Sequence, residues 1–150
     1  MIYIGYPGIG KSSMKEVIDL ESSNFMVNGE RDKNWAITYA KIAIDLDRQG
    51  YNVFLSSHKD VRDALKSLKA KFYCIFPCLE LKSEWIYRLT DRFLKDNSEK
   101  NKKSLIRCIT SYYEDISDLM QEENPIIIEK SQYDSYKLKE LCLLQIQNQL

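Results

Sequence analysis

The chain has 150 residues, 44% of them hydrophobic, which is enough for one sizeable core, so we expect a single domain over residues 1–150. Its 22 basic residues equal its 22 acidic residues, and this zero net charge argues against a nucleic-acid partner or a membrane surface. The 4 cysteines lack the close paired spacing of a zinc site, and no apolar run could span a membrane, so we expect a cytoplasmic protein with reduced thiols.

The chain begins with a predicted strand and a glycine-rich loop. Residues 1–4 are a short apolar run that ends at a Gly/Pro cluster, as a buried parallel strand does. The following sequence, GYPGIGKS, matches the phosphate-loop pattern G-x-x-x-x-G-K-[ST] in full. Glycines let the backbone wrap a phosphate, and the positive end of a following helix would face the same anion. Lys11 would reach the β and γ oxygens of a nucleoside triphosphate such as ATP, and Ser12 would bind Mg²⁺.

Later segments predict an alternation of strands and helices. Short apolar runs predict strands at residues 17–20, 51–55, 72–76 and 125–128, where Pro125 fits only as a first residue. Helical stripes lie between these runs: Trp35, Tyr39, Ile42 and Leu46, ending at Gly50; Val61, Ala64, Leu65 and Leu68, after a capping box at Ser57; Trp85, Leu89 and Phe93; and Leu105, Ile109, Tyr112, Ile116 and Leu119. The predicted class is α/β, with a mostly parallel five-stranded sheet covered by helices on both faces.

Three segments fall outside this alternation. The polar stretches 22–33 and 95–103, the second reading KDNSEKNKK, predict mobile loops, and residues 136–150 predict a helix. Only a short segment separates Lys11 from the second strand, leaving room for about two helical turns.

Four segments together resemble the nucleoside monophosphate kinase-like branch of the P-loop kinases, including its small phage-type members: GYPGIGKSS, IDLESSNF, VFLSSHKDVRDAL and FPCLELKSEWIYRLTDRF. The likeness spans most of residues 1–130. It implies the P-loop NTPase fold, with the strand order 2-3-1-4-5 and nucleotides at the carboxyl edge of the sheet. It also implies ATP-dependent phosphoryl transfer to a nucleoside monophosphate or a similar small acceptor.

The resemblance assigns roles to individual positions. The donor phosphates and metal would bind at Gly5, Gly8, Gly10, Lys11, Ser12 and Ser13. Asp19 would help to hold Mg²⁺, and Glu21, Ser22 and His58 would contact the acceptor. Arg88 and Arg92 resemble the R-x-x-x-R pair that such kinases present to the transferred phosphate, and segment 95–104 would be a small lid.

Each assignment has a plainer alternative. Asp19 and Glu21 could be solvated residues after a strand, and the two arginines could be the wet face of an amphipathic helix. The lysine-rich stretch could be an ordinary loop, and His58 fits a helix N-terminus near the pocket better than a general base.

One departure from the family pattern keeps a second function open. The third predicted strand ends at Leu55-Ser56-Ser57, without the acid that supports the metal in many P-loop proteins. A non-catalytic nucleotide-binding or sensing module that acts through a protein partner is therefore the alternative to a kinase. A kinase acting on nucleic-acid 5′ ends fits less well, because the chain has no net positive charge.

Overall fold

Five parallel strands form the centre of the structure, a computed structural model that describes residues 1–11 and 14–135. They are β1 (Ile2–Gly5), β2 (Ile18–Asp19), β5 (Val53–Ser56), β6 (Tyr73–Pro77) and β7 (Pro125–Ile128). All neighbours in this sheet pair in parallel, and Pro125 is the first residue of its strand, where its missing N–H is tolerated. The predicted α/β class with a mostly parallel five-stranded sheet is confirmed.

The sheet order is β2-β5-β1-β6-β7. The strand numbers differ from the expected 2-3-1-4-5 because the chain also forms a separate hairpin of β3 (Met26–Val27) and β4 (Glu30–Arg31). With the hairpin left out of the count, the first strand is central, and the third and fourth strands are its neighbours. The hairpin turns at Asn28 and Gly29, which both have positive φ, as a tight two-residue turn requires.

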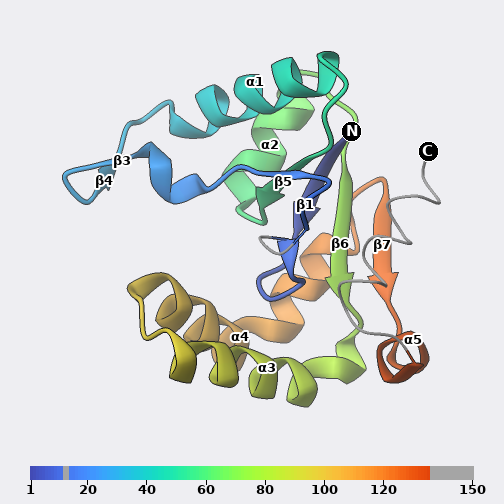
Figure 1. Ribbon diagram of the computed structural model, residues 1–150. Helices are drawn as coiled ribbons and strands as arrows, with labels where there is room; N and C mark the ends of the chain where they lie inside the picture. Colours follow the sequence, from blue (N-terminus) through green and yellow to red (C-terminus); the bar gives the residue numbers. More distant parts are fainter. Residues whose placement is uncertain (12–13, 136–150) are drawn as a thin grey trace.

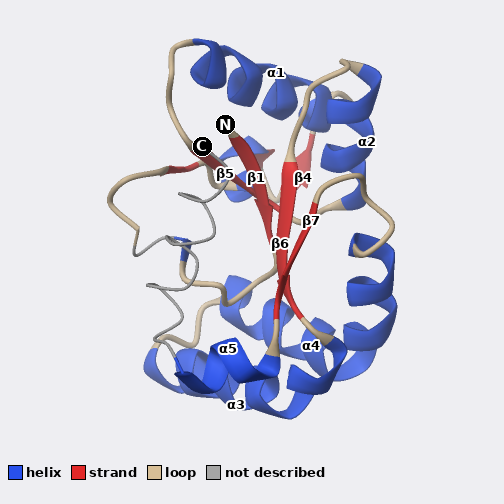
Figure 2. Cartoon of the chain, turned by 90° about the vertical axis from the view of Figure 1, so that its right-hand side faces the viewer, coloured by secondary structure: helices blue, strands red, loops and turns tan. Residues whose placement is uncertain are grey.

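Helices flank the sheet and cross its carboxyl edge. They are α1 (Trp35–Arg48), α2 (Lys59–Ser67), α3 (Lys82–Lys95), α4 (Glu99–Leu119) and α5 (Lys130–Ser135), with short 3-10 turns at Ser22–Phe25 and Leu79–Leu81. Helices α1 and α2 pack on each other, as do α3 and α4. Figures 1 and 2 show α3 below the arrowheads of β6 and β7, so this helix lies at the edge where parallel strands end.

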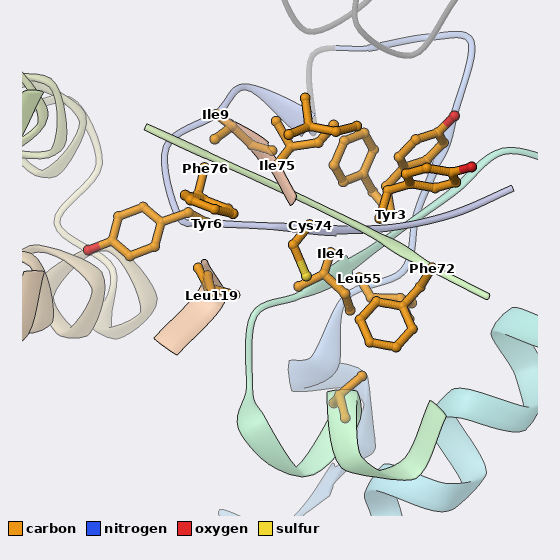
Figure 3. Close-up of a cluster of buried hydrophobic side chains, with 14 of the residues drawn as sticks. Tyr3, Ile4, Tyr6, Ile9, Leu55, Phe72, Cys74, Ile75, Phe76 and Leu119 are labelled. Carbon is orange, nitrogen blue, oxygen red and sulfur yellow. The ribbon is translucent and has the colours of Figure 1, made fainter. Parts of the chain in front are cut away.

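The core lies around β1 and β6. Tyr3, Ile4 and Ile75 are fully buried, and the apolar runs that predicted these strands are buried on both faces. Figure 3 shows Tyr6 and Ile9, from the loop after β1, among the same side chains. The loop is therefore anchored in the core at its start.

The prediction of a helix between the glycine loop and β2 is wrong for the described residues of that segment. Lys11 and Met14 are joined by one turn, Lys15 and Glu16 form another turn, and β2 begins at Ile18. So short a segment cannot offset the cost of helix nucleation with propagated hydrogen bonds.

Both polar stretches expected as loops contain regular structure. Segment 22–33 holds the 3-10 turn Ser22–Phe25 and the β3-β4 hairpin. In segment 95–103, α3 ends at Lys95 and α4 begins at Glu99, so only residues 96–98 connect the two helices. The expected lid is therefore a helix-helix corner, and Ser98 caps α4 by accepting a hydrogen bond from the Asn101 N–H at 3.3 Å.

Two smaller expectations are also wrong. Helix α2 has His58 as its N-cap, without a side-chain capping bond, so Ser57 does not form a capping box. Ile109 is 49% exposed, because α4 breaks its helical geometry at Ser111 and its buried stripe runs through Cys108 and Tyr112.

Among residues 1–11 and 14–135, Cys74 and Cys108 are buried thiols and Cys78 is half-buried, all without a disulfide. Cys142 and the predicted helix 136–150 lie outside the described residues. In the part of the chain that the structure describes, no helix has the length and apolar character needed to cross a membrane.

Candidate functional site

The glycine loop leaves the central strand at the carboxyl edge of the sheet. Gly5 lies beside Ser56 of β5 and Ile75 of β6, and the Tyr6 N–H still donates to the Ile75 carbonyl at 3.0 Å. Ile9 is fully buried, so it fixes the middle of the loop in the core. A Cβ on Gly5 would lie 2.5 Å from Ile9 Cδ1, so Gly5 permits this close packing.

Helix α3 holds the loop from the other side. Trp85 Nε1 donates to the Pro7 carbonyl at 2.7 Å, and Arg88 Nε donates to the Gly8 carbonyl at 2.5 Å. Gly8 has φ +90°, and a Cβ there would lie 2.9 Å from Leu89 Cδ2. Only glycine meets both the backbone conformation and the close approach of α3.

A cavity of about 570 Å³ opens between the loop, the end of β2 and the α3-α4 corner. Its basic lining residues are Lys11, Arg88, Arg92, Lys95 and Lys100, and its acidic ones are Asp19, Glu21, Asp91 and Asp96; Gly8, Gly10, Ser98 and Asn101 complete it. The volume is within the range of small-molecule sites. Basic groups from three parts of the chain converge on it, which suits an anionic ligand.

Lys11 faces two carboxyl groups in this cavity. Burial lowers the pKa of Lys11, and the charges of Asp19 and Glu21 only partly counteract this. Burial also raises the pKa of the Asp19 carboxyl, an effect that Lys11 opposes and Glu21 reinforces. Asp19 Oδ1 is buried without a hydrogen-bond partner. The charged groups of Lys11, Asp19 and Glu21 are therefore close together, but their hydrogen bonding is incomplete, as is common at functional sites.

Glu21 connects Lys11 and Asp19 to the α3-α4 corner. Lys100 Nζ, in the first turn of α4, lies 2.5 Å from Glu21 Oε1. Burial would raise the pKa of Glu21, but the hydrogen bond from Lys100 and the charges of Lys100 and Lys11 lower it below its ordinary value. The Asn101 side chain donates to the Asp96 carbonyl at 2.8 Å and so shapes the corner from which Lys100 projects.

The acidic groups fit Mg²⁺ only together with a phosphate ligand. Within the described ranges, no group of three or more His, Cys, Asp or Glu side chains could hold a metal ion. Mg²⁺ commonly uses one or two carboxylates and completes its shell with phosphate oxygens and water. The unpartnered oxygen of Asp19, beside Glu21, is suited to that role.

The cavity brings together seven of the predicted site residues: Gly8, Gly10, Lys11, Asp19, Glu21, Arg88 and Arg92. Gly5, Ser22 and His58 are not among its lining residues. Ser12 and Ser13 lie outside the described residues. The sequence-predicted donor loop and arginine pair therefore meet, whereas two of the three predicted acceptor residues lie elsewhere.

Ser22 and His58 belong to a neighbouring cluster around the β3-β4 hairpin. Arg31 donates to Ser22 Oγ at 3.2 Å and lies over the Trp35 ring, 4.2 Å from its centroid. The His58 ring packs edge-on against Trp35. Burial lowers the pKa of His58 to about 4, with help from the charges of Arg31, Arg107 and Lys11, so this imidazole is neutral at neutral pH.

Sequence reasoning missed several contributors to the site. The helical stripe predicts Trp85 only as a core residue, whereas its indole N–H also donates a hydrogen bond to the loop. The polar stretch 95–103 predicts a mobile loop, or a small lid by the resemblance, for Lys95, Lys100 and Asn101. The sequence Asn97-Ser98 before a glutamate and a lysine-rich run is a helix N-terminus signal, which could have placed Lys100 on a helix.

Comparison with models of known protein families gave no match for this chain. The search of curated proteins gave no match either.

Proposed function

We propose that the chain is an ATP-dependent small-molecule kinase of the P-loop type. It would bind the triphosphate of ATP, or of a similar nucleotide, in the cavity beside Gly8, Gly10 and Lys11. It would transfer the γ-phosphoryl group to a nucleoside monophosphate or a similar small acceptor. The acceptor oxygen then forms the new P–O bond, the bond to the bridging oxygen breaks, and the nucleoside diphosphate leaves.

One observation carries this proposal. A loop with the phosphate-loop pattern leaves the central strand of a parallel sheet, and its lysine enters a cavity that also receives Arg88 and Arg92. Ligands of open α/β sheets bind at the carboxyl ends of the strands, where the loop lies. The pattern and its position in the fold thus support the same ligand class.

The chain's own residues would mainly bind and orient the ligand. Lys11 and Arg92 would neutralise phosphate oxygens, and Arg88 would do so while holding the loop through the Gly8 carbonyl. Asp19 and Glu21 would hold Mg²⁺, which when bound offsets charge on the phosphates. The α3-α4 corner would limit the access of water to the cavity.

A coupled kinase assay tests the proposal. Purified protein is incubated with Mg·ATP and a panel of nucleoside monophosphates, and Lys11→Ala and Lys15→Ala are assayed in parallel. Lys15 is an exposed lysine close in sequence that does not line the cavity, so it is the matched control. We expect turnover with at least one acceptor, lost in Lys11→Ala and kept in Lys15→Ala. Equal turnover in both variants would contradict the assigned site.

A nucleotide-binding module without catalysis is the second candidate. Two observations favour it: β5 ends at Ser56 rather than at an acid, and the segment from Met14 to β2 forms turns instead of a helix. Both features would weaken support for the metal and the phosphates. Saturable ATP binding that depends on Lys11, with no turnover on any acceptor, would select this alternative.

A further inference from the structure

An ion pair crosses the candidate phosphate cavity between two segments that are far apart in the sequence. Lys100 is in the first turn of α4, and Glu21 follows β2, 79 residues earlier. Their charged atoms are 2.5 Å apart, and both side chains line the cavity together with Lys11. The pair therefore connects the α3-α4 corner to the end of β2 at the site itself.

The Lys100–Glu21 pair is in a position that a ligand can reach. The Lys100 side chain is 46% exposed and the Glu21 side chain 28% exposed. A partly exposed ion pair contributes little net stability, because water already screens its attraction. A polyphosphate offers an ammonium group several charged oxygens as acceptors, so it can replace one partly solvated carboxylate as the partner of Lys100.

We infer that Lys100 is a phosphate-binding residue, which Glu21 holds at the cavity until a polyphosphate anion takes its place. The inference rests on the proposed phosphate site. Glu21 keeps the lysine ordered in the ligand-free protein, and binding exchanges one carboxylate partner for phosphate oxygens. The two partners then separate, and the ligand joins the corner to the loop.

The other cations of the cavity have different connections. Lys95 pairs with Asp91 on its own helix, at a site where both side chains are largely exposed. Arg88 donates one of its N–H groups to the Gly8 carbonyl. Lys100 approaches from α4 rather than from α3 or the loop, so it adds a contact from another side of the cavity.

Binding of inorganic tripolyphosphate tests the inference without metal or catalysis. Isothermal titration in EDTA compares the wild type with Glu21→Gln, Lys100→Gln and the double variant. Glu21→Gln should bind about fivefold tighter, because the competing carboxylate is gone. Lys100→Gln should weaken binding about threefold in the wild type and about tenfold in the Glu21→Gln background, where no pair has to be broken first.

Lys102→Gln is the control for net charge, since Lys102 lies near the N-terminus of α4, as Lys100 does, but does not line the cavity. It should change the affinity less than twofold, as expected for an exposed charge. If Lys100→Gln has no more effect than Lys102→Gln in the Glu21→Gln background, Lys100 only stabilises the corner and the inference is overturned.

A Lys11→Ala variant separates this inference from the proposed function. Tripolyphosphate binding that depends on Lys11 but not on Lys100 would leave the proposed site intact and overturn the role of Lys100. No binding to the wild type, or binding that is independent of Lys11, would overturn both.

Discussion

Two clusters of charged residues in this protein differ in how well their charges are paired. The first, which we call the clamp, joins α2 to the end of α4 through Arg62, Lys66, Asp118 and Glu122. Arg62 contacts Asp118 at 2.5 Å and Glu122 at 2.6 Å, and its side chain is 5% exposed. The second is the cavity cluster of Lys11, Asp19, Glu21 and Lys100.

The two clusters shift the pKa of one cation each, the buried Arg62 and the half-buried Lys11, in opposite directions. Burial alone would lower the pKa of Arg62, but the hydrogen bonds that Arg62 donates to Asp118 and Glu122, together with the charges of these carboxylates, outweigh it and raise the pKa. For Lys11, burial outweighs both neighbouring carboxyl groups and lowers the pKa. The clamp thus stabilises its charges by itself, whereas the cavity cluster holds a cation that an added anion would stabilise. This is the difference that we expect between a structural ion network and the proposed binding site.

The largest expected effect is the loss of stability when the clamp is broken. Arg62→Met leaves the Glu122 carboxylate, whose side chain is 7% exposed, without its main partner. Removing one member of a buried pair costs about 3 kcal/mol of unfolding free energy. Chemical denaturation of both proteins measures this loss. Lys66→Met, which removes a half-exposed partner of the same carboxylate, should cost much less. Equal losses would show that burial does not distinguish the two cations.

The matching change in the cavity cluster should affect ligand binding instead of stability. Lys11→Met removes a cation that burial already disfavours, so the free energy of unfolding should change by less than about 1 kcal/mol. Tripolyphosphate affinity should fall about thirtyfold, because a hydrogen bond between charged groups contributes about 2 kcal/mol. Denaturation and isothermal titration on the same samples check both values. A large loss of stability with unchanged affinity would reverse the comparison.

The third effect concerns the packing of the glycine loop on α3. Gly8→Ala combines an unfavourable positive φ with a contact of 2.9 Å to Leu89 Cδ2, whereas Gly50→Ala at φ +89° meets nothing within 4 Å. Gly50→Ala should therefore cost about 1 kcal/mol for the backbone alone, and Gly8→Ala at least about 1 kcal/mol more for the displaced side chain. Chemical denaturation of both variants gives the difference. Equal losses would mean that α3 moves away without cost.

The parts of this structure that local patterns control were predictable from sequence. Apolar runs located all five strands of the central sheet, and the 3.6-residue stripes located α1 to α4. The phosphate-loop pattern placed Lys11 next to the central strand, and the spacing of Arg88 and Arg92 placed both on α3. The Asn28-Gly29 turn was also readable, and the hairpin was missed because its strands, Met26–Val27 and Glu30–Arg31, are too short to show a strand pattern.

Contacts between distant segments were not predictable from these patterns. Nothing local in the sequence relates Lys100 to Glu21 or Trp85 to the Pro7 carbonyl. The prediction of a helix after the glycine loop was wrong because the phosphate-loop pattern is usually followed by a helix, whereas here the segment before β2 is too short to form one. His58 likewise looked like a site residue by position, yet its ring packs on Trp35.

The smallest expected effect tests the environment of His58, beside the cavity cluster. Burial, followed by the charges of Arg31, Arg107 and Lys11, lowers the pKa of His58 from 6.5 to about 4, and Asp60 opposes this shift. The unfolded chain therefore binds more protons between these pH values, so the stability contributed by neutral His58 is complete above pH 6.5 and is lost as the pH falls toward 4. Allowing for its partial exposure, we expect the wild type to lose about 1 kcal/mol more than His58→Gln between pH 7 and pH 5. Denaturation curves of both proteins at the two pH values measure this difference. Parallel losses would show that His58 titrates as in the unfolded chain, so that neither its burial nor the neighbouring cations shift its pKa.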